Sequence, residues 1–194
     1  MSKQIIAIDV DEVLSSLLPD IISYHNKKYK TNYVMDDFYT YDYWKVWGGT
    51  KNQAIAKVDE FTKRGGFANL QTIQGSQNAI QKLKSKYRLF VVSSRKSDLK
   101  GTTYEWLENK FPKCFEKALF GNHYDLKAGP SVSKSQLCRQ IQADYFIDDL
   151  PHYAKECADM GIKTYLFGDY PWNKADVEGA VRVANLDDIV RILM

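Results

Sequence analysis

The sequence has few of the features that mark a secreted, membrane-bound or disordered protein. Its three cysteines are scattered without CxxC spacing, which argues against a disulfide framework or a zinc site and favours reduced thiols in a cytoplasm. Its apolar runs, such as residues 89–92, are far shorter than the ~20 residues of a membrane span. Eleven Gly and five Pro are too few for a linker-dominated chain. We therefore expect a folded cytoplasmic protein with no leader peptide and no membrane partner.

The chain also lacks a block of charge of one sign. Its net charge of +3 is spread along the sequence, so nucleic acid is not an indicated partner. A hydrophobic fraction of 44% is ordinary for a globular protein and argues against disorder. The length of 194 residues corresponds to one domain, or to one domain with a modest insertion. This composition is compatible with a homodimer.

Strand-like and helix-like segments alternate along the chain. Apolar runs of strand length cover residues 4–8, 89–92, 145–147 and 163–167, with a shorter run at 117–120. Helical spacing of apolar residues covers 14–30, 51–63, 79–83, 99–111, 133–142, 151–160 and 186–193. Strands that are apolar throughout are typical of a parallel sheet buried on both faces. The pattern predicts an α/β fold in three layers, a Rossmann-like parallel sheet flanked by helices.

Acidic residues follow two of these predicted strands. Asp9 and Asp11 come after the first, and Asp148 and Asp149 come after a later one. Because ligands bind at the carboxyl edge of open α/β sheets, we expect these carboxylates to converge there. Like charges brought together need a cation or a shared proton, and hard oxygen ligands suit Mg²⁺.

Other polar residues are suited to binding phosphate. Ser93 and Ser94 follow the run 89–92, and Lys134 lies at the start of a predicted helix. Hydroxyls and an ammonium group bind phosphate oxygens, and a carboxylate can accept a phosphoryl group as an aspartyl-phosphate. Each residue alone has a simpler interpretation, since Asp commonly caps helices and a helix lysine is commonly solvated. Only the joint pattern predicts Mg²⁺-assisted phosphoryl transfer.

Together these residues resemble the four ordered motifs of the haloacid dehalogenase-like hydrolases. The motifs are Asp9-Val10-Asp11-Glu12-Val13, Ser93, Lys134 and Asp148-Asp149, each after an apolar run or at the expected place between them. The resemblance implies that Asp9 is the nucleophile and that Asp11 is the general acid and later the base. It implies that Ser93 binds the phosphoryl oxygens and that Lys134 neutralises charge between nucleophile and phosphate.

The same resemblance implies a Mg²⁺ site made by Asp9, the backbone carbonyl of Asp11, Asp148 and Asp149. Asp at position 11 favours phosphatases and phosphotransferases over the dehalogenases of this superfamily. Glu12 departs from the pattern because the family commonly has Gly there. We expect its longer side chain to narrow the entrance or to add charge.

The long segment after the first motif resembles the helical cap of this superfamily. We expect the core to comprise residues 1–14 and 73–194 and the cap to comprise 15–72. Seven aromatic residues fall between positions 33 and 47, where the average of 13% would place about two. Most of them are expected to form the cap's own core, with one or two facing a ligand. The candidates for substrate contact are Phe38, Tyr43, Trp44 and Trp47, together with Ser94 and Arg95 of the core.

Cap size and aromatic content are similar to the 5′(3′)-deoxyribonucleotidase-like branch of the superfamily. This similarity implies a Mg²⁺-dependent phosphomonoesterase that acts on a small phosphorylated substrate, a nucleoside monophosphate. Two alternatives stay open at this point. One is a phosphatase of sugar phosphates or of nucleic-acid 3′-phosphate ends, and the other is a non-catalytic protein of the same fold that binds a phosphate ligand.

Overall fold

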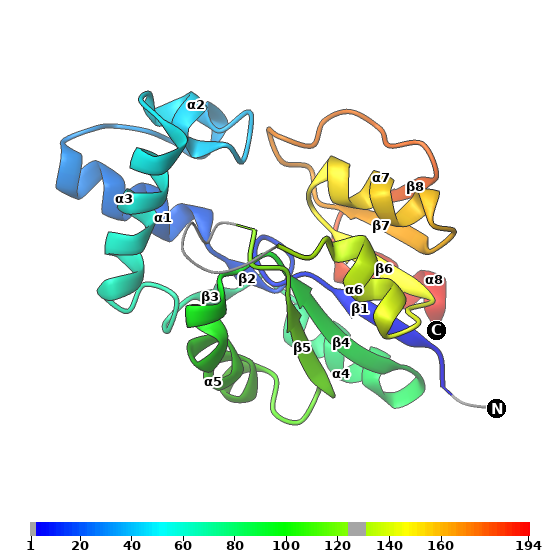
Figure 1. Ribbon diagram of the computed structural model, residues 1–194. Helices are drawn as coiled ribbons and strands as arrows, with labels where there is room; N and C mark the ends of the chain where they lie inside the picture. Colours follow the sequence, from blue (N-terminus) through cyan, green and yellow to red (C-terminus); the bar gives the residue numbers. More distant parts are fainter. Residues whose placement is uncertain (1–2, 124–130) are drawn as a thin grey trace.

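A six-stranded parallel sheet forms the centre of the protein. The computed structural model describes residues 3–123 and 131–194 (Figure 1). The strands, in their spatial order, are β5 (Lys117–Phe120), β4 (Arg88–Ser93), β1 (Ile5–Ile8), β6 (Tyr145–Asp148), β7 (Lys163–Phe167) and β8 (Ala180–Val183). All four residues of β1 are buried, as expected for a strand covered by helices on both faces. The predicted α/β fold with a parallel sheet is therefore confirmed.

Helices cover both faces of the sheet. On one face α4 (Ser76–Lys86) packs against α8 (Leu186–Leu193), and on the other α6 (Lys134–Gln140) packs against α7 (Pro151–Asp159) (Figure 1). The helix α5 (Lys100–Lys110), preceded by the 3-10 turn η2 (Ser97–Leu99), connects β4 to β5. Within the described residues, no helix is long and apolar enough to cross a membrane.

A second group of helices stands beyond the carboxyl edge of the sheet. It contains α1 (Leu18–Tyr29), the 3-10 turn η1 (Met35–Asp37), α2 (Tyr43–Trp47) and α3 (Lys51–Lys63) (Figure 1). The chain leaves and returns through two short antiparallel strands, β2 (Ser15–Ser16) and β3 (Gln71–Thr72). We refer to residues 15–72 as the cap. The two ends of this segment are paired side by side, which fits an insertion, but the division into two domains stays a prediction.

Several elements, α2 among them, were not expected from the sequence. The strand β8 reads Ala-Val-Arg-Val and lies at the edge of the sheet, where only Val183 is buried, so it lacks a continuous apolar run. The strands β2 and β3 have two residues each, which is too short for a periodic signal. The helix predicted over 14–30 begins at Leu18, with Pro19 in the first turn, where proline is tolerated.

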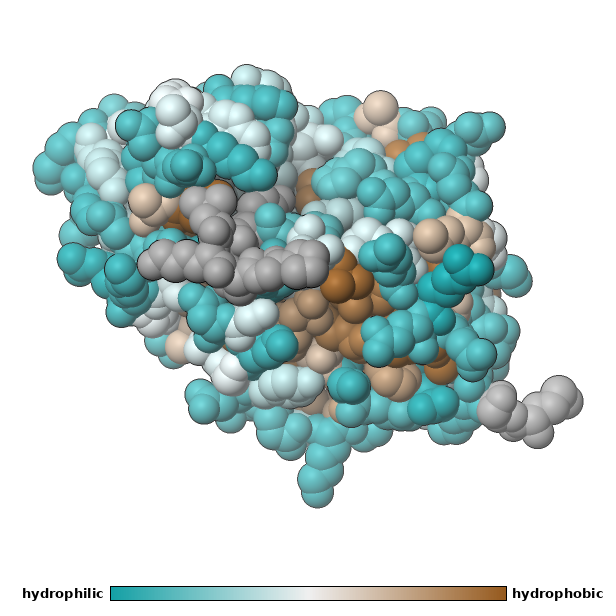
Figure 2. Space-filling model, in the orientation of Figure 1, coloured by the Kyte–Doolittle hydropathy of each residue, from teal (hydrophilic) through white to brown (hydrophobic). Residues whose placement is uncertain are grey.

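The surface is mostly hydrophilic on the face shown in Figure 2. Apolar side chains gather there beside β5, which is an edge strand of the sheet (Figure 2). The large core lies elsewhere, between the sheet and its helices and within the cap.

Candidate active site

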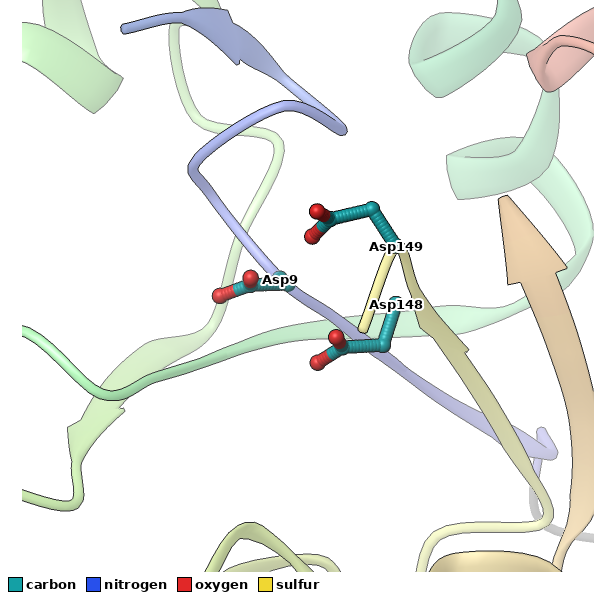
Figure 3. A group of neighbouring side chains, drawn as sticks. All are labelled: Asp9, Asp148 and Asp149. Atoms are coloured by element: carbon teal, nitrogen blue, oxygen red, sulfur yellow. The ribbon is translucent and has the colours of Figure 1, made fainter. Parts of the chain in front are cut away.

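Three of the strand-end aspartates converge at the carboxyl edge of the sheet. Asp9 follows β1 and Asp148 ends β6, and these strands pair in parallel with Ile8 opposite Ile147. One carboxylate oxygen from each of Asp9, Asp148 and Asp149 lies within 4.8 Å of the others, and all three residues are buried. Their side chains point to the same side of the sheet edge (Figure 3). Adjacent parallel strands therefore bring together carboxylates that lie about 140 residues apart in sequence.

Lys134 lies within this acidic group. Its Nζ is 2.8 Å from Oδ2 of Asp9 and 2.6 Å from Oδ2 of Asp148, with only 2% of the side chain exposed. Ser133 caps α6 by accepting a hydrogen bond from the backbone N–H of Gln136, which places Lys134 in the first turn. Burial alone would lower the pKa of Lys134, but the carboxylates of Asp148 and Asp9 raise it well above its usual value. The lysine therefore stays charged.

Each aspartate has a different set of partners. Oδ1 of Asp9 is buried and has no hydrogen-bond partner among the described residues. Burial raises the pKa of Asp9 to about 7, against the attraction of Lys134. Oδ1 of Asp148 accepts a hydrogen bond from the backbone N–H of Leu150 at 2.9 Å. Oδ2 of Asp149 accepts one from the indole of Trp172 at 2.7 Å, and burial raises the pKa of Asp149 well above its usual value.

This donor set fits a hard divalent cation. In their ionised forms the three buried carboxylates carry more negative charge than one lysine can balance, and one oxygen of Asp9 has no partner among the described residues. Such oxygens are the ligands that Mg²⁺ takes in proteins. The residues that would hold the ion are Asp9, Asp148 and Asp149. The expected contribution of the Asp11 backbone carbonyl stays a prediction.

The carboxylate of Asp11 is not part of this group. It accepts hydrogen bonds from Nε of Arg95 at 3.0 Å and from Nη2 of Arg95 at 2.6 Å, and Ser15 Oγ donates to it at 3.0 Å. The Nη1 of Arg95 donates to Thr103 Oγ1 at 3.0 Å, and the guanidinium lies over the ring of Phe67. Arg95 therefore holds Asp11 in place.

A cavity of about 900 Å³, open to solvent, lies between this edge and the cap. Asp9, Asp11, Lys134 and Asp149 line one end. The cap contributes most of the apolar and aromatic residues of the lining: Leu17, Ile21, Tyr43, Trp44, Ala54, Ile55 and Val58, with Tyr41 beside them. Lys96, which follows β4 of the core, forms an ion pair with Asp59 of α3 in the cap, and both residues line the cavity. The arrangement provides charged groups at one end and room for an apolar, planar group at the other.

Some of the residues expected to contact substrate line this cavity and others do not. Tyr43, Trp44, Ser94 and Arg95 line the cavity. Phe38 and Trp47 are not among the lining residues, so for these two a ligand contact stays a prediction that the cavity does not support. Phe38 is fully buried, with the rings of Tyr33, Tyr43 and Trp47 packed edge-on against it, and Trp47 stacks on His25 at 4.4 Å. Phe38 therefore belongs to the buried core, and the partly buried Trp47 packs against it.

The two serines after β4 also differ in position. Ser93 is buried, and its Oγ accepts a hydrogen bond from the backbone N–H of Arg95 at 3.2 Å. Ser94 lines the cavity, and its Oγ donates to the hydroxyl of Tyr153 at 2.9 Å. Ser93 itself is not among the residues lining the cavity.

Glu12 does not narrow the entrance, contrary to the expectation from its length. It is not among the residues lining the cavity, and its Oε1 accepts hydrogen bonds from the backbone N–H groups of Leu17 at 2.8 Å and Leu18 at 2.6 Å. The carboxylate thus satisfies free N–H groups at the start of α1, where a negative charge is favourable. The backbone φ of Glu12 is 58°, in the region that favours glycine. Burial raises the pKa of Glu12 to about 7.

Sequence reasoning missed three residues at this site. Trp172 and Asn173 hold Asp149, the first through its carboxylate and the second through a hydrogen bond to its backbone carbonyl at 2.9 Å. Tyr41 lines the cavity beside the acidic end. Tyr41 belongs to the aromatic cluster noted in the sequence, but no pattern separates it from its neighbours. For Trp172 and Asn173 no motif marks the loop after β7.

Comparisons with known proteins agree with this geometry. The family described as "5' nucleotidase, deoxy (Pyrimidine), cytosolic type C protein" matches residues 3–194. A 5′(3′)-deoxyribonucleotidase of Bacillus subtilis is 32% identical over 198 residues, which cover 99% of each chain.

Solved structures share the fold at low sequence identity. A putative phosphoglycolate phosphatase from Lactobacillus plantarum has a TM-score of 0.72 at 13% identity, with 100% of both chains covered. A putative hydrolase of the haloacid dehalogenase superfamily from Bacillus subtilis, described as bound to magnesium, has a TM-score of 0.66 at 13% identity, covering 100% of this chain and 99% of the other. The resemblance inferred from the four motifs is therefore confirmed. The chain belongs to the cytosolic type C family of deoxy (pyrimidine) 5′ nucleotidases and is a phosphoric monoester hydrolase.

Proposed function

We propose that this hydrolase is Mg²⁺-dependent, that it acts through an aspartyl-phosphate on Asp9, and that its substrates are nucleoside monophosphates. The observation that carries the proposal is the free Oδ1 of Asp9, which is buried at the charged end of the cavity beside Lys134. A buried carboxylate oxygen with no partner among the described residues is available to attack phosphorus.

The chain's own residues account for the proposed chemistry. Oδ1 of Asp9 attacks phosphorus, so that a bond forms between them while the bond to the ester oxygen breaks. Asp11, in its protonated form and with its ion pair to Arg95 opened, protonates the leaving oxygen. It then takes a proton from the water that hydrolyses the aspartyl-phosphate, which regenerates the Asp9 carboxylate and releases inorganic phosphate. Lys134 favours the ionised form of Asp9, which the attack requires.

A bound Mg²⁺ would offset the negative charge of the phosphoryl oxygens near the carboxylates. Asp9, Asp148 and Asp149 would hold it, and Trp172 fixes the orientation of Asp149. Hydrogen bonds of this kind tune the affinity of a metal site.

The cap wall supports a nucleotide as substrate. Tyr43 and Trp44 offer aromatic faces and Ile55 and Val58 an apolar surface, and base–aromatic stacking contributes ~1–3 kcal/mol per base in single-strand binders. The relative named 5′(3′)-deoxyribonucleotidase supports the same class of substrate. A sugar phosphate would leave this aromatic wall without a planar group to contact.

The test is phosphate release from a panel of ribo- and deoxyribonucleoside 5′- and 3′-monophosphates, sugar phosphates and a 3′-phosphorylated oligonucleotide. Wild-type protein is assayed in Mg²⁺ and in EDTA, beside Asp9→Asn and the control Asp36→Asn, an exposed aspartate of η1. We expect metal-dependent release that favours nucleoside monophosphates and falls at least about 1,000-fold in Asp9→Asn. The control should match wild type.

Each part of the proposal has its own refutation. Full activity in Asp9→Asn would refute the aspartyl-phosphate, and full activity in EDTA would refute the metal dependence. A preference for sugar phosphates or for the oligonucleotide would refute the proposed substrate class.

A further inference from the structure

Tyr41 is a cap residue that lines the same cavity as the acidic residues of the core. It lies just before α2 and lines the cavity together with Asp9, Asp11 and Lys134. These three residues belong to the core, so Tyr41 is a place where the cap reaches the proposed reaction centre.

The hydroxyl of Tyr41 is buried and unsatisfied. Its oxygen is buried and has no hydrogen-bond partner among the described residues, although Tyr41 is one of the residues that line the cavity. Buried polar groups in proteins are almost always hydrogen-bonded, and a group that is not needs a specific explanation. A donor directed to a ligand that enters the cavity is such an explanation.

The surroundings of the hydroxyl are anionic. Burial raises the pKa of Tyr41 well above its usual value, and the nearby Tyr43, Glu12, Asp11 and Asp149 raise it further. The phenol therefore keeps its proton across the physiological range and is able to donate a hydrogen bond. Its natural acceptor is an anionic oxygen that arrives with the substrate.

Packing holds Tyr41 in position relative to the acidic group. Its ring meets the ring of Trp172 edge-on, with centroids 5.4 Å apart and an interplanar angle of 73°. The indole of Trp172 in turn donates its hydrogen bond to Asp149. The same indole thus positions both a proposed metal ligand and the tyrosine from the cap.

We propose that Tyr41 is a further substrate-contacting residue, whose hydroxyl donates a hydrogen bond to an oxygen of the phosphoryl group. This inference rests on the proposed function. The phosphoryl group is the natural acceptor because Tyr41 packs on Trp172, which holds Asp149, and lines the cavity together with Asp11. Ile55 and Val58 of α3 are apolar and suit a base instead. The cap therefore contributes to the phosphate site as well as to the wall that would contact the base.

The test uses Tyr41→Phe, which removes the hydroxyl and keeps the ring on Trp172. The matched control is Tyr39→Phe in the same segment. Tyr39 is 61% exposed, its hydroxyl donates to the carbonyl of Lys45, and it is not among the residues lining the cavity. Binding of inorganic phosphate in Mg²⁺ is measured by calorimetry. Hydrolysis is measured on nucleoside monophosphates with different bases and on p-nitrophenyl phosphate, which has no base.

We expect Tyr41→Phe to weaken phosphate binding about tenfold and to lower kcat/KM by about 10- to 100-fold, the usual effect of losing a hydrogen bond to a charged group. The loss should be similar for every base and for p-nitrophenyl phosphate. The melting temperature should not fall, because the hydroxyl has no partner to lose among the described residues. Tyr39→Phe should match wild type in both assays.

Two results would overturn the inference. Unchanged phosphate affinity in Tyr41→Phe would show that the hydroxyl does not contact the phosphoryl group. A loss confined to nucleotides, with p-nitrophenyl phosphate unaffected, would show that it contacts the nucleoside instead. Failure of the proposed function gives a different pattern, in which wild-type protein releases no phosphate from any substrate while phosphate binding still depends on Tyr41.

Discussion

Replacing Lys134 with methionine tests the electrostatics of the acidic group directly. The substitution keeps the length of the side chain and removes its charge. Asp9, Asp148 and Asp149 then stay buried within 4.8 Å of one another without the ammonium group that contacts two of them. We expect the folded state to lose stability in the absence of metal and to regain it when Mg²⁺ is added.

The magnitude follows from the burial of both partners. Removing one member of a buried ion pair costs about 3–5 kcal/mol, because the charge left behind has no compensation. Lys134 makes two such contacts, at 2.8 and 2.6 Å, and no partner is more than 6% exposed. However, burial already raises the pKa of Asp9 to about 7, and loss of the lysine raises it further. Asp9 therefore takes up a proton in the variant, which limits the loss to about 3 kcal/mol near pH 7.

The pH dependence has a definite sign. When folding raises the pKa of a carboxyl, the free energy of unfolding falls as pH rises, because the unfolded chain releases the proton at a lower pH than the folded chain does. The difference between Lys134→Met and wild type should therefore be larger at pH 8 than at pH 6.

The assay is urea unfolding followed by tryptophan fluorescence, in EDTA and in Mg²⁺. The control is Lys174→Met, a lysine with a 58% exposed side chain that pairs with Asp169, for which we expect a change within about 0.5 kcal/mol. Mg²⁺ should stabilise Lys134→Met more than wild type, because once the ion displaces the proton from Asp9 the variant site carries one more negative charge than the wild-type site. A loss below about 1 kcal/mol in EDTA, or equal stabilisation of both proteins by Mg²⁺, would refute this reasoning.

Two further predictions concern residues outside the acidic group. Trp172→Phe removes the hydrogen bond to Asp149 and should weaken Mg²⁺ binding by about 10- to 100-fold in a calorimetric titration, whereas unchanged affinity would mean that the indole does not orient the ligand. Burial and the neighbouring Lys57 lower the pKa of His25 from 6.5 to about 4. Between these two pH values the unfolded chain binds more protons than the folded chain. The free energy of unfolding should therefore fall as pH is lowered through this range. His25→Phe keeps a ring against Trp47 but cannot titrate, so its unfolding free energy should fall less over the same range; an identical slope would assign the effect to other groups.

The sequence by itself was enough to predict the sheet and the convergence of the acids. Buried parallel strands must be apolar along their length, so β1, β4, β6 and β7 stand out as continuous runs. The carboxyl ends of such strands meet at one edge, so Asp9 and Asp148 had to lie close together once the strands were recognised. The edge strand β8 escaped prediction because partial exposure breaks its apolar pattern.

The partners of the site residues could not be predicted in this way. Arg95 contacts Asp11 across 84 positions and Trp172 contacts Asp149 across 23, and neither pair shares a periodic pattern. Glu12 was expected at the entrance, but its backbone turn directs the carboxylate to the start of α1. Hydrogen bonds between distant side chains depend on how elements pack and on the rotamers that the packing allows.

The different positions of the aromatic residues in the cap could not be predicted from the sequence either. Phe38, Tyr41 and Trp47 have similar chemistry and lie within ten residues of one another, and composition gave no reason to choose Phe38 and Trp47 rather than Tyr41 as candidates for ligand contact. Phe38 is instead buried inside the cap and the partly buried Trp47 packs against it, while Tyr41 lines the cavity and packs on Trp172. The sequence determined that this segment is aromatic and that the sheet edge is acidic. Only the tertiary structure decided which ring faces the cavity, because that depends on the packing of the cap helices against one another and on the approach of the loop after β7.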